Sequence, residues 1–329
     1  MIKVAQIGVG YWGPNILRNL AKNDQFDVVA VSDLSAERGE YVKSNYPGVD
    51  FFLDPASIFT NENIDAVVIA TPVHTHFDLA MKALKAGKHI LVEKPMATNS
   101  DEINQIISIS KEKNLTAMVG HTFIFNKAVR YVKAIIDDGK LGDIRYIYSQ
   151  RLNLGRIRND IDALWNLAPH DISIVQYWLD NKYPIKIKRN GMDYIQDGID
   201  DVVFLNLTYP DKIIVNIHVS WLDPLKVRKM IIVGTKKMVV YDDISDNKIS
   251  IYDKGIDKMA VLGENMDFDK PFKSSFNYRS GDVIMPKIQW EEPLKLEINH
   301  FLDCITKGVD CLSGPESAGE VVKILECSK

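Results

Sequence analysis

Cysteine is scarce in this chain of 329 residues, and no two cysteines have the C-x-x-C spacing of a metal or redox motif. The three cysteines are Cys304, Cys311 and Cys327, and none lies in a sequence context that activates a thiol. A sparse, odd-numbered set in a chain of this length favours a reducing compartment and free thiols. Histidines, cysteines and carboxylates also lack the spacing of a ligand set, so we expect no metal site.

Long apolar runs and an excess of basic residues are missing as well. No stretch of about 20 apolar residues exists, so we expect no membrane span and no membrane partner. The N-terminus lacks the basic segment and apolar core of a secretory signal, and we therefore expect a cytoplasmic protein. The chain has 40 Lys and Arg against 44 Asp and Glu, a net charge of −4. This balance argues against a general nucleic-acid-binding function.

The first 120 residues alternate between short apolar runs and stretches with helical periodicity. The expected strands are Lys3–Gly8, Phe26–Asp33, Ile64–Thr71, His89–Glu93 and Thr116–Gly120. The expected helices between them are Asn15–Lys22, Ser35–Asn45, Thr75–Ala86 and Ser100–Lys113. Nearly continuous apolar strands separated by helices predict a parallel, doubly wound sheet that is covered on both faces.

The pattern changes after about residue 121, which predicts one domain over residues 1–121 and a second over 122–329. Here long β-like runs follow one another with short connections, at 202–209, 212–221, 227–234 and 236–243. They predict a mostly antiparallel, open sheet with helices on one face. Further helices are expected at Lys127–Asp138, His170–Leu179, Leu294–Thr306 and Glu316–Glu326, a further strand at Gly142–Leu152, and a long, partly irregular excursion at Ile256–Trp290. The expected fold class is therefore α/β throughout.

Three glycines form a G-x-G-x-x-G motif between the first expected strand and the first helix, at Gly8, Gly10 and Gly13. In that setting the motif predicts a dinucleotide site, with the pyrophosphate at the helix N-terminus. Asp33 ends the second strand, 25 residues after Gly8, where a carboxylate would bind ribose hydroxyls and repel a 2′-phosphate. NAD is therefore favoured over NADP, while a glycine turn without a ligand is the alternative.

Tyr11 and Trp12 lie inside the glycine motif. They are equally consistent with a wall beside the pyrophosphate and with packing residues.

Lys94 follows the strand His89–Glu93 directly, in the sequence Glu93-Lys94-Pro95. Ligands of doubly wound sheets bind beyond the carboxyl ends of the strands, so this lysine is a candidate catalytic residue. Its ammonium would stabilise a developing alkoxide; a surface lysine in a turn is the alternative.

With these residues in place, the chain resembles the glucose–fructose oxidoreductase/inositol dehydrogenase/MocA (Gfo/Idh/MocA) family. The matching segments are GVGYWG at 8–13, ATPVHTH at 70–76, AGKHILVEKP at 86–95, VGHTFIFN at 119–126, GKLGDIRYIYS at 139–149, APHDISI at 168–174 and EPLKLEINHF at 292–301. The resemblance implies a Rossmann domain, a second domain whose open sheet joins subunits into a dimer or tetramer, and NAD(P)-dependent oxidation or reduction at a sugar carbon. It also implies that Thr71, Pro72, His76, Glu93 and Lys94 line the cofactor site.

His170 is the best candidate for general acid–base catalysis, since an unperturbed imidazole titrates near neutrality. A structural histidine near a helix start is the alternative. The family usually has an aspartate four residues before this histidine, and here Asn166 occupies that position. Asparagine can hydrogen-bond a substrate hydroxyl but cannot titrate, so a role that needs a carboxylate there is in doubt.

The segment RLNLGRIR at 151–158 supplies Arg151, Asn153 and Arg158 as candidate substrate-binding residues. Arginine suits bidentate binding of phosphate or carboxylate, and surface ion pairs are an equal alternative. The segment resembles the nucleotide-sugar branch of the family, whose members act on the sugar 3-hydroxyl or a 3-keto sugar. The leading hypothesis is an NAD-dependent dehydrogenase of a nucleotide-linked sugar. An NADPH-dependent keto-sugar reductase and a non-catalytic dinucleotide-binding regulator are the alternatives.

Overall fold

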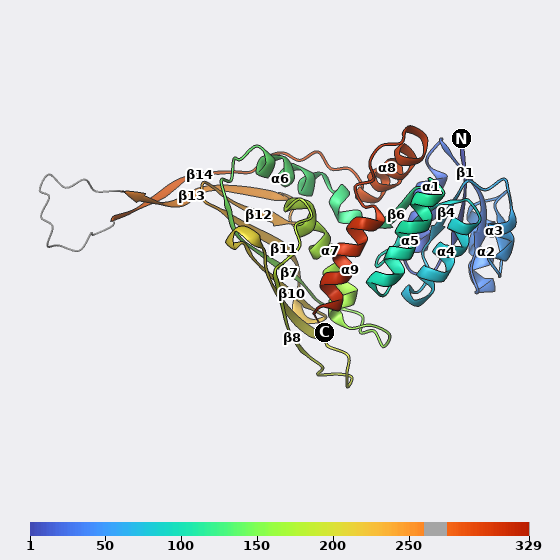
Figure 1. The fold of residues 1–329 in the computed structure, drawn as a ribbon, viewed down its shortest axis with the longest axis horizontal. Helices are drawn as coiled ribbons and strands as arrows, with labels where there is room; N and C mark the ends of the chain where they lie inside the picture. Colours follow the sequence, from blue (N-terminus) through green and yellow to red (C-terminus); the bar gives the residue numbers. More distant parts are fainter. Residues whose placement is uncertain (260–274, 329) are drawn as a thin grey trace, which may run out of the picture. The chain divides into compact units, whose positions relative to one another are not determined.

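The computed structural model describes residues 1–259 and 275–328 of the chain. The chain forms two compact units, and each is built from separate segments (Figure 1). Unit 1 comprises Met1–Asn126, Leu164–Tyr183 and Trp290–Lys329, and unit 2 comprises Lys127–Ala163 and Pro184–Gln289. A single boundary at residue 121 therefore does not describe how the chain is grouped in space, because two later segments return to unit 1.

Unit 1 is built around a six-stranded parallel sheet with the strand order β3-β2-β1-β4-β5-β6. The strands are β1 (Ile2–Ile7), β2 (Phe26–Ser32), β3 (Asp50–Phe52), β4 (Ala66–Ile69), β5 (His89–Glu93) and β6 (Ala117–Gly120). This order reverses between β1 and β4, and folds of this kind bind ligands at the carboxyl ends of the strands beside such a reversal. The predicted doubly wound sheet is confirmed.

Helices cover both faces of this sheet. They are α1 (Gly13–Ala21), α2 (Ala36–Asn45), α3 (Ala56–Thr60), α4 (His76–Lys85), α5 (Ser100–Glu112), α7 (Ala163–Trp178), α8 (Pro293–Lys307) and α9 (Pro315–Glu326), with 3-10 turns η1 (Val73–Thr75) and η2 (Thr122–Phe125). The alternating side chains of the central strands are buried on both faces, which explains why the strands read as continuous apolar runs. The two larger apolar clusters lie on opposite faces of the sheet, and a smaller third cluster contains Val9, Leu17, Val31 and Val42.

The helices α8 and α9 belong to these two clusters although they come at the end of the sequence. Val322 of α9 joins the cluster that contains Ile103 and Ile106 of α5. Phe301 of α8 joins the other cluster, where its ring stacks on Phe26 at a centroid distance of 6.4 Å. Each fully buried side chain of this size contributes about 1.5–3 kcal/mol to stability. The unit that holds the glycine loop therefore depends on the C-terminal helices.

Unit 2 contains an eight-stranded sheet with the order β14-β13-β12-β11-β7-β10-β9-β8. Its elements are α6 (Lys127–Asp137), β7 (Ile144–Leu154), β8 (Lys186–Met192), β9 (Val202–Thr208), η3 (Pro210–Lys212), β10 (Ile214–Ser220), β11 (Leu222–Gly234), β12 (Met238–Asp242), β13 (Ile249–Met259) and β14 (Ser275–Ile284). Among the described pairs, β7–β10 alone is parallel. The predicted mostly antiparallel sheet is confirmed.

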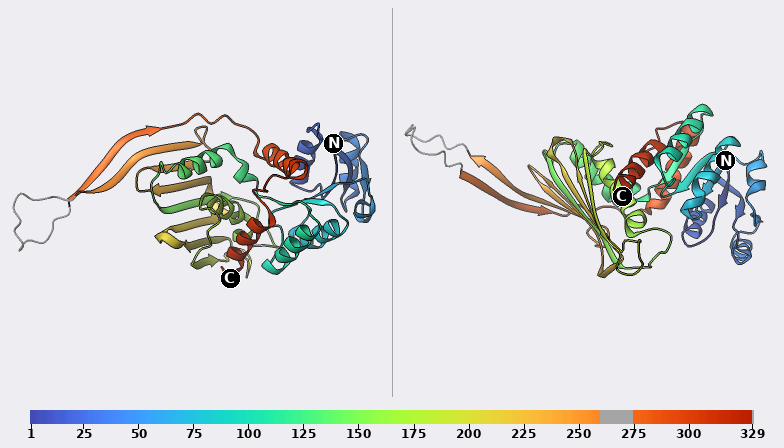
Figure 2. Two further views of the ribbon diagram at one scale, coloured as in Figure 1. Left: turned by 45° about the horizontal axis from the view of Figure 1, so that its top comes forward. Right: turned by 60° about the horizontal axis from the view of Figure 1, so that its bottom comes forward.

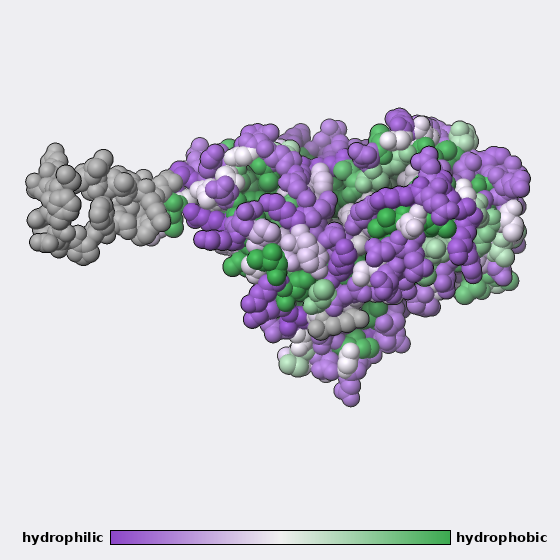
Figure 3. Space-filling view, viewed as in Figure 1, coloured by the Kyte–Doolittle hydropathy of each residue, from purple (hydrophilic) through white to green (hydrophobic). Residues whose placement is uncertain are grey.

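One face of this sheet is buried and the other is partly open. On β9, Val203, Leu205 and Leu207 are fully buried, whereas Phe204 between them is 43% exposed. The helix α6 packs near β12, and Figure 2 shows it along one face of the strands. Hydrophilic residues cover much of the molecular face in Figure 3, with scattered hydrophobic patches. No helix within the described residues is long and apolar enough to cross a bilayer.

The segment Ile256–Trp290, expected to be partly irregular, contains two paired strands in its described part. The strands β13 and β14 pair antiparallel, with Ile256 opposite Tyr278. Figure 1 shows them as a two-stranded ribbon that continues beyond the other strands of the sheet. Residues 260–274, also part of that expectation, lie outside the described residues.

Candidate functional site

The glycine loop between β1 and α1 is shaped by close backbone contacts. Gly8 has a φ of +93°, and a Cβ there would lie 2.5 Å from the carbonyl oxygen of Ala70. A Cβ on Gly13 would lie 2.5 Å from the carbonyl oxygen of Gly8. Both distances are far below a van der Waals contact, so the fold itself requires glycine at these two positions.

Two polar side chains hold the loop in place. The buried Gln6 amide donates hydrogen bonds to the carbonyls of Gly8 and Gly13, at 2.8 and 2.9 Å. Asp33 follows β2, and its Oδ2 accepts a hydrogen bond from the Val9 amide at 2.8 Å. Its Oδ1 accepts from the Ser35 amide at 2.9 Å. The Asp33 carboxylate is thus fixed beside the loop, and each oxygen keeps lone-pair capacity for a further donor.

Gly10 differs from its two neighbours and provides a test for a bound dinucleotide. A Cβ on Gly10 would meet no described atom within 4 Å, and its φ lies outside the left-handed region. Neither the backbone nor the packing therefore requires glycine at this position. No described side chain caps the N-terminus of α1, so its amides remain directed at this open space. The loop fits the pyrophosphate of a dinucleotide, which needs close approach to the backbone.

The two aromatic residues of the loop have different surroundings. Tyr11 is 89% exposed, so it is not a packing residue in the described chain. Trp12 is 41% exposed, and a hydrogen bond from its side chain favours the ionised form of Glu93. Trp12 therefore links the glycine loop to the end of β5. A wall beside the pyrophosphate stays a prediction for both residues.

Lys94 lies at the carboxyl end of β5, as the sequence predicts. Its Nζ donates a hydrogen bond to the backbone carbonyl of Asn166 at 2.9 Å. The Lys94–Pro95 peptide bond is cis. Asn166 is on α7, one helical turn before His170, because residues four apart lie on the same face of a helix. Lys94 and His170 are thereby brought to the same part of unit 1.

The carboxyl group of Glu93 is the neighbour of Lys94 at this strand end. Burial raises its pKa to about 7, although the positive charge of Lys94 and hydrogen bonds from the Lys94 amide and from Trp12 act in the opposite direction. Gly120 is opposite Glu93 in the pairing of β5 with β6, and a Cβ on Gly120 would lie 3.1 Å from the Glu93 Oε1. The absent side chain at Gly120 therefore makes room for this carboxyl group.

A second buried carboxyl group, Glu297 of α8, approaches from the C-terminal segment. Its Oε2 accepts a hydrogen bond from the Thr122 hydroxyl at 2.8 Å, while its Oε1 has no hydrogen-bond partner among the described residues. Burial and the nearby Glu93 charge raise its pKa well above the usual value. Two carboxyl groups that repel each other in a buried site favour a shared or neutral state near neutral pH.

Two histidines and one aromatic ring also lie in this part of unit 1. His121 follows β6 and is buried, and burial together with the Lys94 charge lowers its pKa to about 3. Its imidazole is therefore neutral at physiological pH. The ring of Phe123 packs edge-on against His170, with a centroid distance of 4.9 Å. The site thus combines a cation, a neutral imidazole and a partly buried histidine.

The loop after β4 provides the other predicted cofactor residues, Thr71, Pro72 and His76. Both ring nitrogens of the buried His76 lie 2.8 Å from carbonyl oxygens, those of Pro95 and Thr71. Burial lowers the pKa of His76 in spite of these two bonds. His76 therefore joins the Lys94–Pro95 turn to the loop after β4, and a direct contact between any of the three residues and a cofactor stays a prediction.

The predicted substrate residues Arg151, Asn153 and Arg158 belong to unit 2. Arg151 and Asn153 are on β7, and Arg151 is buried. Arg158 forms a bidentate pair with Asp160, with nitrogen–oxygen distances of 2.8 and 2.5 Å. This local pair fits the ion-pair alternative for Arg158. The structure thus gives Arg151 and Arg158 different surroundings, although sequence reasoning treated them alike.

Sequence reasoning missed His121, Gly120 and Glu297 as parts of the site. His121 stands in the segment VGHTFIFN at 119–126, where no residue pattern by itself indicates a role in the site. Glu297 lies in an ordinary amphipathic helix pattern, so the sequence does not distinguish it from a surface glutamate. Its burial in the fold does, because its side chain is only 1% exposed. Trp165 packs against the apolar cluster that includes residues of α4 and α5.

Family models match both halves of the chain. Residues 2–121 match the model described as "Oxidoreductase family, NAD-binding Rossmann fold", and residues 129–240 match the "GFO/IDH/MocA C-terminal domain". The chain belongs to the Gfo/Idh/MocA family of oxidoreductases. The fold and the glycine loop thus agree with a site for a nicotinamide dinucleotide.

Several curated proteins are similar to this Gfo/Idh/MocA chain. A UDP-N-acetylglucosamine 3-dehydrogenase from Acidithiobacillus ferrooxidans is 27% identical over 260 residues, which cover 77% of this chain and 78% of that protein. An inositol 2-dehydrogenase from Rhodococcus erythropolis is 28% identical over 207 residues, 61% of this chain and 60% of that protein. The chain covers less than two thirds of the length of several such relatives. One of them, an uncharacterised oxidoreductase from Streptococcus pneumoniae, is 26% identical over 232 residues, which are 64% of this chain and 60% of that protein.

Solved structures share the fold over nearly the whole chain. The structure of the Acidithiobacillus ferrooxidans enzyme has a TM-score of 0.80 at 23% identity, covering 99% of this chain and 96% of that one. GenD2 from gentamicin A biosynthesis, solved in complex with NAD, has a TM-score of 0.82 at 18% identity, covering 99% of this chain and 93% of that one. At these identities the likeness establishes the fold.

Proposed function

We propose that the chain is an NAD-dependent dehydrogenase that oxidises the 3-hydroxyl group of a nucleotide-linked sugar. The observation that carries this proposal is the hydrogen bond from Lys94 Nζ to the carbonyl of Asn166. It holds an ammonium group at the carboxyl end of β5 and one helical turn from His170. A cation and a titratable base at that edge of a dinucleotide-binding sheet suit the oxidation of an alcohol.

Each residue has a distinct task in this reaction. Bound NAD would accept a hydride from the carbinol carbon. The Lys94 ammonium stabilises the negative charge that develops on the substrate oxygen. The electrostatic stabilisation by a fixed cation is largest where water is excluded. His170 accepts the hydroxyl proton. His121 is neutral beside Lys94, so it adds no positive charge that would compete with the lysine.

The choice of NAD over NADP rests on Asp33. Its carboxylate is held by the amides of Val9 and Ser35 at the edge of the glycine loop. A carboxylate fixed there accepts hydrogen bonds from the ribose hydroxyls and repels a 2′-phosphate. Quenching of the protein fluorescence by NAD and by NADP would measure the preference, and we expect at least tenfold tighter binding of NAD. Equal affinities would favour the NADPH-dependent reductase instead.

The nucleotide-linked substrate is supported by Arg151 and by the similarity to the UDP-N-acetylglucosamine 3-dehydrogenase. An arginine buried in β7 provides a planar donor suited to a diphosphate. Asn166 replaces the usual aspartate, so this position offers an amide to the substrate and no titrating group.

The decisive experiment measures NAD reduction with a panel of nucleotide sugars and free sugars. We expect turnover with a nucleotide sugar, and a loss of at least 100-fold in kcat in Lys94→Ala. The matched control is Lys82→Ala, which removes an exposed lysine of α4 and should leave kcat unchanged. Undiminished turnover in Lys94→Ala would refute the assignment. Tight NAD binding without turnover of any sugar would instead favour a dinucleotide-binding regulator.

We also propose that the open face of the unit 2 sheet joins subunits into a dimer or tetramer. Tyr146, Phe204 and Ile214 are on that face and are 46%, 43% and 54% exposed. Large apolar side chains gathered on one sheet face are typical of protein interfaces. Light scattering should give a mass at least twice that of one chain, and Phe204→Lys should reduce it. A monomeric wild-type protein would contradict this proposal.

A further inference from the structure

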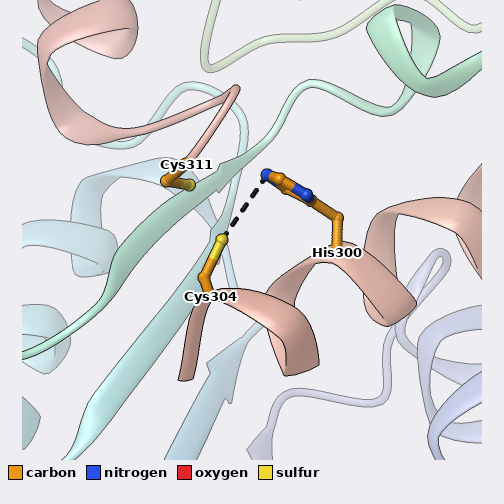
Figure 4. Close-up of side chains that lie close together, drawn as sticks. All are labelled: His300, Cys304 and Cys311. Carbon is orange, nitrogen blue, oxygen red and sulfur yellow. Dashed lines mark hydrogen bonds between the residues drawn. The ribbon is translucent and has the colours of Figure 1, made fainter. Parts of the chain in front are cut away.

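Three side chains with metal-binding atoms lie together outside the site described above. His300 and Cys304 are four residues apart on α8 and therefore share a helix face. Cys311 comes from the loop that connects α8 to α9. The nitrogen of His300 and the two sulfurs all lie within 4.8 Å of one another, and Figure 4 shows the three side chains converging. The sequence predicts no ligand set because the third residue is seven positions beyond the second.

The surrounding backbone fixes the loop that carries Cys311. Gly308, with a φ of +64°, ends α8 in the left-handed conformation and lets the chain turn back. The Ser313 carbonyl accepts a hydrogen bond from the Val119 amide of β6 at 2.8 Å, and the Gly314 amide donates to the Cys311 carbonyl. The loop is thereby attached to the central sheet, so the sulfur of Cys311 is held next to α8.

Backbone hydrogen bonds orient two of the three metal-binding atoms. The Leu312 amide donates to the Nε2 of His300 at 3.0 Å. Because an amide N–H can only donate, this nitrogen carries a lone pair, which is the form that binds a metal. The Ser313 amide donates a hydrogen bond to the sulfur of Cys311 and so orients it, although the hydrogen bond with Cys304 and burial together raise the pKa of this thiol.

The distances match a tetrahedral ion with nitrogen and sulfur ligands. With bonds of about 2.3 Å to sulfur and about 2.0 Å to nitrogen, neighbouring donors in such a site are about 3.5 Å apart. The Cys304 sulfur lies 3.5 Å from His300 Nε2, so this edge of the tetrahedron already exists. The remaining separations of at most 4.8 Å require a movement of about 1 Å, and the ion would replace the Leu312 amide at Nε2.

From this geometry we propose that His300, Cys304 and Cys311 form a binding site for one zinc ion. Two thiolates and one imidazole are ligands that Zn²⁺ prefers over the harder cations Mg²⁺ and Ca²⁺. Cys304 is buried, whereas His300 and Cys311 are partly exposed, so the ion can enter and a water molecule can complete the coordination. The ion would connect α8 to the loop before α9 and so strengthen the C-terminal cover of the sheet.

The test titrates the reduced, metal-free, full-length protein with Co²⁺, a spectroscopic substitute for Zn²⁺. We expect thiolate-to-cobalt absorption in the near ultraviolet that saturates at one equivalent and disappears when Zn²⁺ is added. Cys304→Ser and Cys311→Ser should abolish this absorption. The matched control Cys327→Ser removes an exposed cysteine outside the cluster and should retain it.

A second measurement avoids the case in which a variant fails to fold. In the wild-type protein, Zn²⁺ should protect Cys304 and Cys311 from alkylation but leave Cys327 reactive. Absence of the cobalt absorption at one equivalent would overturn the proposal, as would equal alkylation of all three cysteines with and without Zn²⁺. Recovery of a Cys304–Cys311 disulfide that persists after mild reduction and excludes cobalt would overturn it as well. None of these results depends on the dehydrogenase activity.

Discussion

Substitution of Gly10 by alanine separates the function of the glycine loop from its structure. A Cβ at this position meets no described atom within 4 Å, whereas a Cβ on Gly13 would lie 2.5 Å from a backbone oxygen. Gly10→Ala should therefore fold normally and lose affinity for NAD, because its methyl group occupies the space required by the pyrophosphate. Gly13→Ala should lose stability even without a ligand.

The magnitudes follow from these two environments. Without a clash, Gly10→Ala changes the free energy of unfolding by less than about 1 kcal/mol. We expect a small increase in stability, because alanine restricts the unfolded chain more than glycine does. Gly13→Ala forces a backbone shift and should cost about 1–3 kcal/mol. At an NAD concentration of 100 times Kd, the ligand adds about 2.7 kcal/mol to wild-type stability. A tenfold weaker Kd in Gly10→Ala reduces this gain to about 1.4 kcal/mol.

Thermal unfolding with and without NAD measures both quantities in one experiment. We expect Gly10→Ala to have the wild-type Tm alone and about half the wild-type shift with NAD. Isothermal titration with NAD gives Kd independently. A wild-type Kd in Gly10→Ala would refute the placement of the pyrophosphate, and a strongly lowered Tm without ligand would refute the argument from open space.

Three further predictions concern the surroundings of the site. Because burial raises the pKa of Glu93 from 4.5 to about 7, its penalty on stability grows as the pH rises between these values. Glu93→Gln should therefore gain up to about 3 kcal/mol relative to wild type between pH 4.5 and 8 in urea unfolding, and a constant difference would contradict this. His76→Ala removes a buried imidazole and leaves without a donor the carbonyl that accepts its single N–H, so it should cost about 2–4 kcal/mol by the same method. A double-mutant cycle on the partly exposed Arg18–Glu292 pair, with a nitrogen–oxygen distance of 2.6 Å, should give about 0.5–1 kcal/mol, and zero coupling would contradict it.

The parallel sheet of unit 1 was predictable because its strands are buried on both faces. Such strands are short apolar runs, and β5 was predicted with its observed ends at His89 and Glu93. The strand β3 has only three residues, Asp50–Phe52, and so shows no periodicity. The strand β8, Lys186–Met192, has no fully buried residue and was missed for that reason.

The helix α7 shows how a local rule can fail. The sequence predicts a helix over His170–Leu179, which would leave Pro169 outside a helix interior, where proline is disfavoured. The observed helix begins at Ala163 and contains Pro169. This extension brings the Asn166 carbonyl to Lys94, so the error affected the site itself. Contacts with other segments, which no local pattern contains, stabilise the extra turns.

The residues of the site were predictable where a motif carries them and not where the fold assembles them. Gly8, Asp33, Lys94 and His170 each stood in a recognisable segment. Glu297 is 204 residues beyond Glu93, and nothing in the sequence indicates that their carboxyl groups interact. The cluster at His300 was missed for the same reason, because a loop folds back to supply its third member.

The contribution of α8 and α9 to the first sheet has a consequence for synthesis on the ribosome. The strands of the Rossmann sheet emerge before unit 2, but the helices that cover two of its apolar surfaces are translated after unit 2. Residues 1–126 alone would expose the surfaces that Phe301 and Val322 cover. Unit 1 can therefore complete its apolar clusters only after residues 290–328 have left the ribosome. A chain truncated after Gln289 should consequently require a chaperone to stay in solution and should not retain NAD.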